Sequence, residues 1–314
     1  MDFWILAMRI IFLSQTTIGI LENFSLIFYY LVLYYKECIL KPTDLILVHL
    51  MTANAMIIIS LGVPHTMAAF GLKKFLNNFG CRLLLYIQAF SQSVSIGTTC
   101  LLSVFQIMII RPREFCWKGH KFTRVNYICC SISLLWVFSM LIHFISFVYS
   151  FIKFNSENMT RILDFGYCNS AGDDEIIELF HVAFVMCPEV FFSMLITWSS
   201  SSMIVILYRH KKRVQHIRSS HGYNKTSPES SATQNILVLV STFLVFYSLS
   251  SILRGCIALF YSQNWWLVNI TPLISLCFPS FGPFVLMNCC SIVYKLTLIW
   301  IRNKNNLIFF KVHE

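Results

Sequence analysis

One long stretch without a charged residue most constrains how this chain can fold. From Leu83 to Ile110 no acidic or basic side chain occurs, and the run ends at Arg111. A bilayer-spanning helix needs about 20 mostly apolar residues, so this run is long enough to cross a membrane. Polar residues nevertheless recur along it: Gln88, Ser91, Gln92, Ser93, Ser95, Thr98, Thr99, Ser103 and Gln106. Inside a bilayer such groups need partners, so we expect this segment to be the central, buried helix of a multi-span protein, the alternative being a peripheral span.

The rest of the chain is similarly apolar. Of its 314 residues, 57% are hydrophobic and only 12% are charged. A soluble domain of this length could not bury so much apolar surface. The hydropathy pattern therefore predicts an all-α fold, a seven-transmembrane helix bundle forming a single domain over 1–314. The expected spans are 5–35, 45–72, 83–110, 125–152, 179–208, 232–261 and 265–294, followed by a short tail over 295–314.

The positions of Lys and Arg predict how these spans are oriented. The loops on one side, together with the tail, carry 17 of them, and the N-terminal segment with the loops on the other side carries 6. Because cytoplasmic loops are enriched in basic residues, we expect the N-terminus to be extracellular and the C-terminus cytoplasmic. The net charge of +10 then reflects orientation and contact with the anionic headgroups of the lipid bilayer. We expect no nucleic-acid partner.

Two of the twelve cysteines have a distinctive position. Cys81 and Cys168 are the only ones expected in extracellular loops, where oxidation is favoured. We predict a disulfide between them that ties the long loop before the fifth span to the head of the third, the alternative being two free thiols. The same loop contains the sequon Asn158-Met159-Thr160, which makes Asn158 a candidate glycosylation site. No CxxC pair occurs, so we expect no metal site.

Long sequence segments carry a resemblance to a known family. They read FLSQTTIGILENFSLIFYY, PTDLILVHLMTANAMII, GVPHTMAAFGLKKFLNNFGCRLLLYIQ, VSIGTTCLLSVFQ, HKKRVQHIRSS, TSPESSATQNILVLVSTFLVFY and FPSFGPFVLM. Through them nearly the whole chain resembles the vomeronasal type 1 receptors, a pheromone-sensing family of rhodopsin-like G-protein-coupled receptors. The resemblance implies a chemosensory receptor that binds a pheromone-like small molecule in the extracellular half of the bundle and activates an inhibitory-type (Gi/Go) heterotrimeric G protein. It also implies the plasma membrane of vomeronasal sensory neurons, and no cofactor.

Several motifs of the wider rhodopsin-like class are altered here. Phe-Gln-Ile at 105–107 stands where most members have Asp-Arg-Tyr, and the seventh-span Asn-Pro-x-x-Tyr is reduced to Gly-Pro at 282–283. Asn54 replaces the aspartate of the second span, which weakens a sodium site there. Glu22 stands where this family usually has a small residue before Asn23. A carboxyl at that depth is costly unless it is neutral or paired.

Polar side chains in the outer halves of the spans are the candidate ligand contacts. These are Gln88, Gln92, His143, His181 and Arg254. Arg254 lies about two turns below the expected external end of its helix, where a cation is costly. One interpretation is that it reaches up to the interface or pairs with Glu178 or another acid. The other is that it binds an anionic ligand group such as a sulfate or carboxylate. We interpret Glu189, which follows Pro188, as capping freed backbone groups.

A basic segment follows the fifth span. Its candidate G-protein or inner-leaflet contacts are Arg209, Lys211, Lys212, Arg213 and Arg218. Three competing functions are a bitter-taste-type receptor, a membrane transporter and an intramembrane enzyme; the external cysteine pair and the segments SVFQ and HIRSS argue against the first. A transporter typically shows inverted repeats, and an intramembrane enzyme needs a constellation of catalytic side chains at membrane depth. We find no internal repeat and no HExxH motif, and we expect no enzymatic activity.

Overall fold

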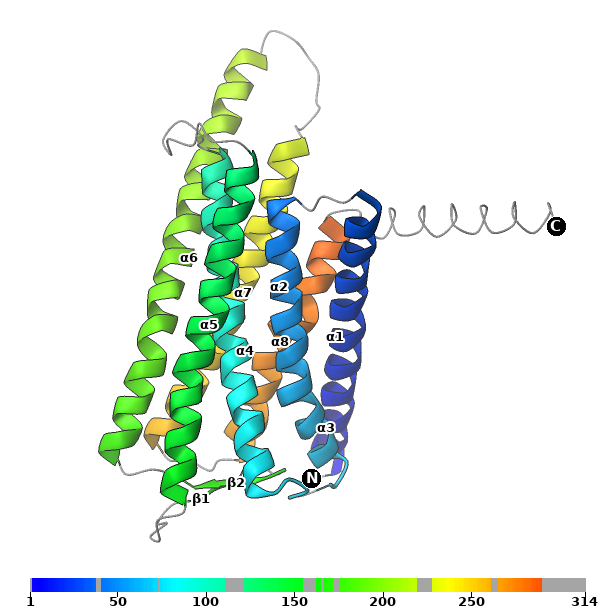
Figure 1. Cartoon of the computed structure of the whole chain (residues 1–314). Helices are drawn as coiled ribbons and strands as arrows, with labels where there is room; N and C mark the ends of the chain where they lie inside the picture. Colours follow the sequence, from blue (N-terminus) through cyan, green and yellow to red (C-terminus); the bar gives the residue numbers. More distant parts are fainter. Residues whose placement is uncertain are drawn as a thin grey trace, which may run out of the picture.

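The structure is a computed structural model that describes residues 2–37, 41–72, 74–110, 121–154, 162–164, 167–171, 175–218, 228–260 and 265–289. Within these ranges seven helical spans are long and apolar enough to cross a bilayer, which confirms the expected seven-helix bundle. The helices are α1 (Asp2–Glu37), α2 (Pro42–Ile57), α3 (Val63–Ala69), α4 (Asn78–Ile110), α5 (Lys121–Phe154), α6 (Glu175–Arg218), α7 (Pro228–Phe260) and α8 (Trp265–Cys289). They lie side by side in one bundle (Figure 1).

The second span contains one widened turn. A π-helical turn, Ile58–Gly62, joins α2 to α3, so these three elements together cross the membrane. A π-helical turn inserts one extra residue into the α-helical hydrogen-bond ladder. Within it the Ser60 hydroxyl donates to the carbonyl oxygen of Met56 at 2.7 Å. Pro64 follows in the first turn of α3, where a missing N–H is tolerated.

The central position expected for the third span is confirmed for α4. This helix packs against α2, α5, α6 and α7. In its membrane-spanning part 67% of the residues are buried, compared with 22–33% in α1, α5, α6 and α7. Its hydroxyls find partners mainly on the helix itself: four of them donate to the carbonyl oxygen four residues earlier, from Ser91, Thr98, Thr99 and Ser103. The backbone of α4 itself therefore accommodates these four hydroxyls.

The main hydrophobic core joins α4 to the helices around it. Leu50 of α2, Leu102 of α4 and Phe243 of α7 belong to this core and are buried. Phe243 also meets Phe278 of α8 edge to face, with ring centroids 4.6 Å apart. This aromatic pair fixes α7 against α8.

A short hairpin covers one end of the bundle. Strands β1 (Ile162–Asp164) and β2 (Asn169–Ala171) pair in antiparallel fashion, with Leu163 opposite Ser170. The hairpin lies at the same end as the N-terminus (Figure 1). Strands of three residues leave no usable hydropathy signal, so the sequence does not predict them.

Candidate ligand-binding site

Arg254 reaches from α7 to the central helix. Its Nη1 donates to Oε1 of Gln92 on α4, and its Nη2 donates to Oγ of Ser251, one turn earlier on α7, at 3.3 Å. Within the part of the chain that the structure describes, Arg254 forms no ion pair; the side chain of Glu178 lies outside it. Neutral oxygens therefore solvate the guanidinium where a counter-ion would be expected.

Arg254 and Gln92 border a small internal cavity. The cavity measures about 20 Å³ and lies between α2, α4, α7 and α8. Its polar lining comprises Gln92, Ser95, Tyr247, Ser250, Arg254 and Ser275. A space of about 10–15 Å³ holds one water molecule, whereas small-molecule pockets usually measure about 300–1,000 Å³. In this conformation the cavity is thus too small for a ligand, which fits there only if the helices move apart.

Two asparagines continue the polar interior towards the other end of the bundle. Ser95, which lines the cavity, donates to Oδ1 of Asn54 at 3.1 Å. Asn23 of α1 donates to the carbonyl oxygen of Pro279 at 2.8 Å. In a regular helix that carbonyl would accept from the residue four positions later, but Pro283 has no N–H. Asn23 therefore replaces the backbone bond that Pro283 cannot form.

Glu22 lies beside this proline break. Its carboxyl group is next to the backbone of Phe284. Its Oε2 is buried and has no hydrogen-bond partner among the described residues. Glu22 and Asn23 of α1 thus both face the segment of α8 that contains Pro283.

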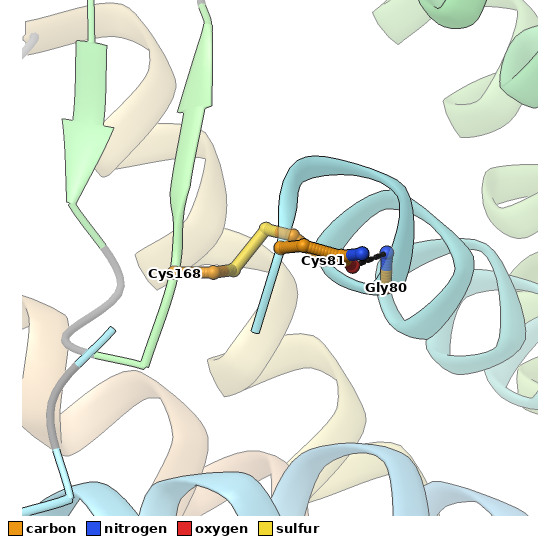
Figure 2. The surroundings of a disulfide bond; sticks show 4 residues. Gly80, Cys81 and Cys168 are labelled. Atoms are coloured by element: carbon orange, nitrogen blue, oxygen red, sulfur yellow. Dashed lines mark hydrogen bonds between the residues drawn. A yellow bond between two sulfur atoms is a disulfide. The ribbon is translucent and has the colours of Figure 1, made fainter. Parts of the chain in front are cut away.

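A disulfide attaches the hairpin to the central helix. Cys81 at the start of α4 and Cys168 directly before β2 are bonded, with Cα atoms 5.8 Å apart (Figure 2). Tyr167 is buried beside them and its ring meets His65 of α3 edge to face at 5.0 Å. His65 in turn stacks on Phe12 of α1 at 5.5 Å. Burial raises the pKa of the Tyr167 phenol, as expected for a side chain packed between the hairpin and the helices.

Two other predicted contacts that the structure describes, Gln88 and His143, do not line the small cavity. Gln88 lies one turn from Gln92 on α4, half-buried, and its Oε1 has no hydrogen-bond partner in the described part of the chain. His143 is buried on α5. His181 belongs to α6, but its side chain lies outside the described residues, as does the whole of Asn158. Among the candidate contacts whose side chains the structure describes, Gln92 and Arg254 are thus brought together at this cavity.

The basic segment after the fifth span is part of the same helix, α6. α6 runs on to Arg218, past the expected end of the fifth span at Tyr208, and projects from the bundle end opposite the hairpin (Figure 1). Arg209 is exposed there. The side chains of the other candidate contacts lie outside the described residues: Lys211, Lys212, Arg213 and Arg218.

Sequence reasoning missed two residues of the site and gave a third another role. Tyr247 and Ser251 precede Arg254 by seven and three positions on α7, a spacing that places all three on one helix face. That spacing is the signal that could have found them. Glu189, interpreted above as a backbone cap, lies near Tyr247 and lines a groove between α6 and α7.

Comparisons with known proteins agree with this architecture. Residues 6–298 match the vomeronasal organ pheromone receptor family. Human vomeronasal type-1 receptor 4 is 44% identical over 92% of this chain and 96% of its own length. Human vomeronasal type-1 receptor 2 is 46% identical over 88% of this chain and 70% of its own length. A zebrafish protein, olfactory receptor class A-like protein 1, is 25% identical over 92% of this chain and 90% of its own length.

Fold and family together define a chemosensory receptor built as a seven-helix, multi-pass protein of the plasma membrane. Within that class, the chain belongs to the vomeronasal organ pheromone receptor family, whose members include the vomeronasal type-1 receptors. Membership extends over nearly the whole chain and favours the vomeronasal-receptor interpretation over the bitter-taste-receptor and transporter alternatives.

Proposed function

We propose that this chain is a G-protein-coupled receptor for a pheromone-like small molecule and that it activates an inhibitory-type (Gi/Go) heterotrimeric G protein. In this proposal the hairpin end faces the outside of the cell and the projecting end of α6 faces the cytosol. The distribution of Lys and Arg along the chain supports that orientation. An oxidising exterior also suits a disulfide at the hairpin end.

The hydrogen bond between Arg254 and Gln92 is the observation that carries the ligand proposal. It links α7 to α4 across the closed cavity. An anionic ligand group, such as a sulfate or carboxylate, is a stronger acceptor for a guanidinium than a neutral amide oxygen. Such a ligand would displace Gln92 from Arg254 and release α7 from α4. Its binding energy would then favour a second arrangement of the helices, as receptor activation requires.

The opposite end of the bundle supports coupling to a G protein. α6 projects there, and the basic residues that begin with exposed Arg209 continue to its end at Arg218. A displacement of α6 or α7 at this end would change which basic side chains a G protein meets. Docking of the G protein against this segment is therefore the second part of the proposal.

A cell-based signalling assay tests the proposal. Cells expressing the chain with an inhibitory-type G protein are screened by cAMP or calcium readout against volatile and sulfated steroid libraries. Arg254→Ala should abolish responses to acidic ligands while leaving surface expression intact. Gln92→Leu removes the competing acceptor, so it should preserve or increase the same responses. Unchanged dose–response curves for Arg254→Ala would reject the assignment of Arg254 to the ligand.

A further inference from the structure

A second, larger cavity lies on the lipid-facing side of the bundle. It is an open groove of about 640 Å³ between α6 and α7, in the usual size range of small-molecule sites. Its walls are formed by apolar side chains that are half or more exposed: Val190, Met194 and Trp198 of α6, and Ile252 of α7. The groove runs along the part of α6 that crosses the membrane, so its occupant comes from the bilayer.

The carboxyl group of the groove lies at one of its ends. Glu189, Tyr247 and Ser251 all line it. The Tyr247 hydroxyl is buried near Glu189 and Ser251, and both Glu189 and Arg254 act on it electrostatically. On α6, Glu189 is the groove residue nearest the hairpin end, and Ser201 is the one farthest from it. The groove therefore offers a carboxyl group towards the hairpin-side membrane surface. Below it lie mainly apolar walls, with the hydroxyls of Ser193, Thr197 and Ser201 between them.

The charge of the lining restricts the class of occupant. The described lining contains one carboxyl group and neither Lys nor Arg. Within this described lining, a phospholipid phosphate or a fatty-acid carboxylate would meet no cation and would lie close to Glu189, while Arg254 behind it already donates to Gln92 and Ser251. A hydroxyl group can instead donate to the carboxyl of Glu189. The body of the occupant must match a groove formed by apolar side chains and the flat ring of Trp198.

We propose that a membrane sterol of the hairpin-side leaflet binds in the groove between α6 and α7, with its hydroxyl at Glu189 and its ring system along Met194 and Trp198. A sterol has one hydroxyl on a rigid apolar body, so it loses little conformational freedom on binding. Plasma membranes are rich in sterol. The proposal depends on the plasma-membrane location of the chain and is independent of the ligand and G protein proposed above.

The same arrangement connects the sterol site to the internal cavity. Tyr247 lines both the groove and the cavity. Ser251 lines the groove and accepts a hydrogen bond from Arg254. An occupant of the groove therefore lies one residue away from the Arg254–Gln92 bond between α7 and α4. A bound sterol would hold α7 in its present rotation and oppose release of Arg254.

Photolabelling of the purified full-length chain tests the site without any G protein. The chain is placed in phosphatidylcholine vesicles with a diazirine-bearing cholesterol analogue that keeps its free hydroxyl, and labelled peptides are mapped. Label should concentrate on the α6 segment that contains Met194 and Trp198. Unlabelled cholesterol should compete about tenfold better than its methyl ether, because the ether cannot donate to Glu189. Oleate should compete poorly.

Two threonines give a matched pair of variants. Thr197 lines the groove and Thr242 of α7 does not. Thr197 is exposed and Thr242 half-buried, and each donates to the carbonyl four residues earlier at 2.8 Å. Thr197→Trp should fill the groove and reduce labelling about tenfold, and Thr242→Trp should leave it unchanged. Glu189→Leu gives a second test, since removing a carboxyl at membrane depth should not harm folding. It should abolish the advantage of cholesterol over its methyl ether.

Three results would overturn the sterol site. These are equal labelling of the two tryptophan variants, label spread evenly over the lipid-facing helices, and competition by oleate as strong as that by cholesterol. The first two would show that the label is not held in the groove, and the third that the groove does not distinguish a sterol from other bilayer lipids. A chain that labels as expected but fails to signal would contradict only the proposed function, and a chain that signals without selective labelling would contradict only the sterol site.

Discussion

The α2 and α4 spans differ from the α6 and α7 spans in how they are packed. In the membrane-crossing parts of the first pair 67% of the residues are buried, whereas the values for α6 and α7 are 28% and 22%. α7 packs extensively on α8 and far less on α6, and a groove separates α6 from α7. Because fewer contacts have to be broken, α6 and α7 can separate at a lower free-energy cost than α2 and α4. The bundle thus combines a densely packed part with a loosely packed part.

The candidate ligand contacts lie where these two parts meet. Arg254 belongs to the loosely packed part and Gln92 to the densely packed part. A ligand that competes for Arg254 acts at this boundary, where a small change in contacts shifts the position of α7. The densely packed part, which contains α2 and α4, keeps its position while α7 shifts relative to it.

The largest expected effect concerns the covalent link between the hairpin and the packed part. Cys168→Ser removes a disulfide with a sequence separation of 87 residues and should lower the free energy of unfolding by about 4 kcal/mol. Thermal unfolding of purified protein and cell-surface staining measure the loss. Cys187→Ser, at a free and exposed cysteine of α6, is the control and should have little effect. Equal stability of the two variants would show that the hairpin contributes nothing to the packed part.

The next effect concerns the proline break in α8. Asn23→Ala should cost about 2 kcal/mol, because the carbonyl of Pro279 then has neither a backbone donor nor the Asn23 amide. Ser14→Ala on the same helix removes an exposed side-chain bond to the carbonyl of Ile11 and should change stability little. Chemical or thermal unfolding of both variants in the same detergent makes the comparison. A neutral Asn23→Ala would mean that the break tolerates an unsatisfied carbonyl.

The smallest effects compare one glycine from each part. A Cβ added at Gly97 of α4 would lie 2.8 Å from Cδ2 of Leu135 on α5 and closer still to Cδ1. Gly97→Ala should therefore destabilise the protein by about 1 kcal/mol. A Cβ at Gly255 of α7 would meet nothing within 4 Å, so Gly255→Ala should stabilise it by about 0.5 kcal/mol through helix propensity. Thermal unfolding measures both shifts, and shifts of the same sign would contradict the proposed difference in packing.

Much of this architecture could be predicted from hydropathy and charge. The seven spans follow from runs of apolar residues, and the central position of α4 follows from polar residues in a run without charges. The structure also joins Cys81 to Cys168, the pair that the expected topology placed on one side. These features depend on composition along the chain, which the sequence displays directly.

The site was harder to predict because it depends on how each helix is rotated. Gln88 and Gln92 are one turn apart on α4, yet only Gln92 reaches the cavity of Arg254. Hydropathy places both at similar depth and cannot say which neighbour each side chain faces. The same holds for Glu189, whose groove depends on how α6 and α7 pack against each other. The hairpin strands were missed because their three residues are held by pairing and by the disulfide.

The π-helical turn between α2 and α3 has a consequence for how the hairpin packs on the bundle. An extra residue in a helix rotates everything that follows by roughly 100° about the axis. With the turn at Ile58–Gly62, the imidazole of His65 faces both Phe12 and Tyr167. Deleting exposed Ile59 would restore a regular ladder and swing that imidazole away from the phenol. One residue inserted within the second span thus sets the contacts of His65 with Phe12 and Tyr167, which hold the hairpin against the helices.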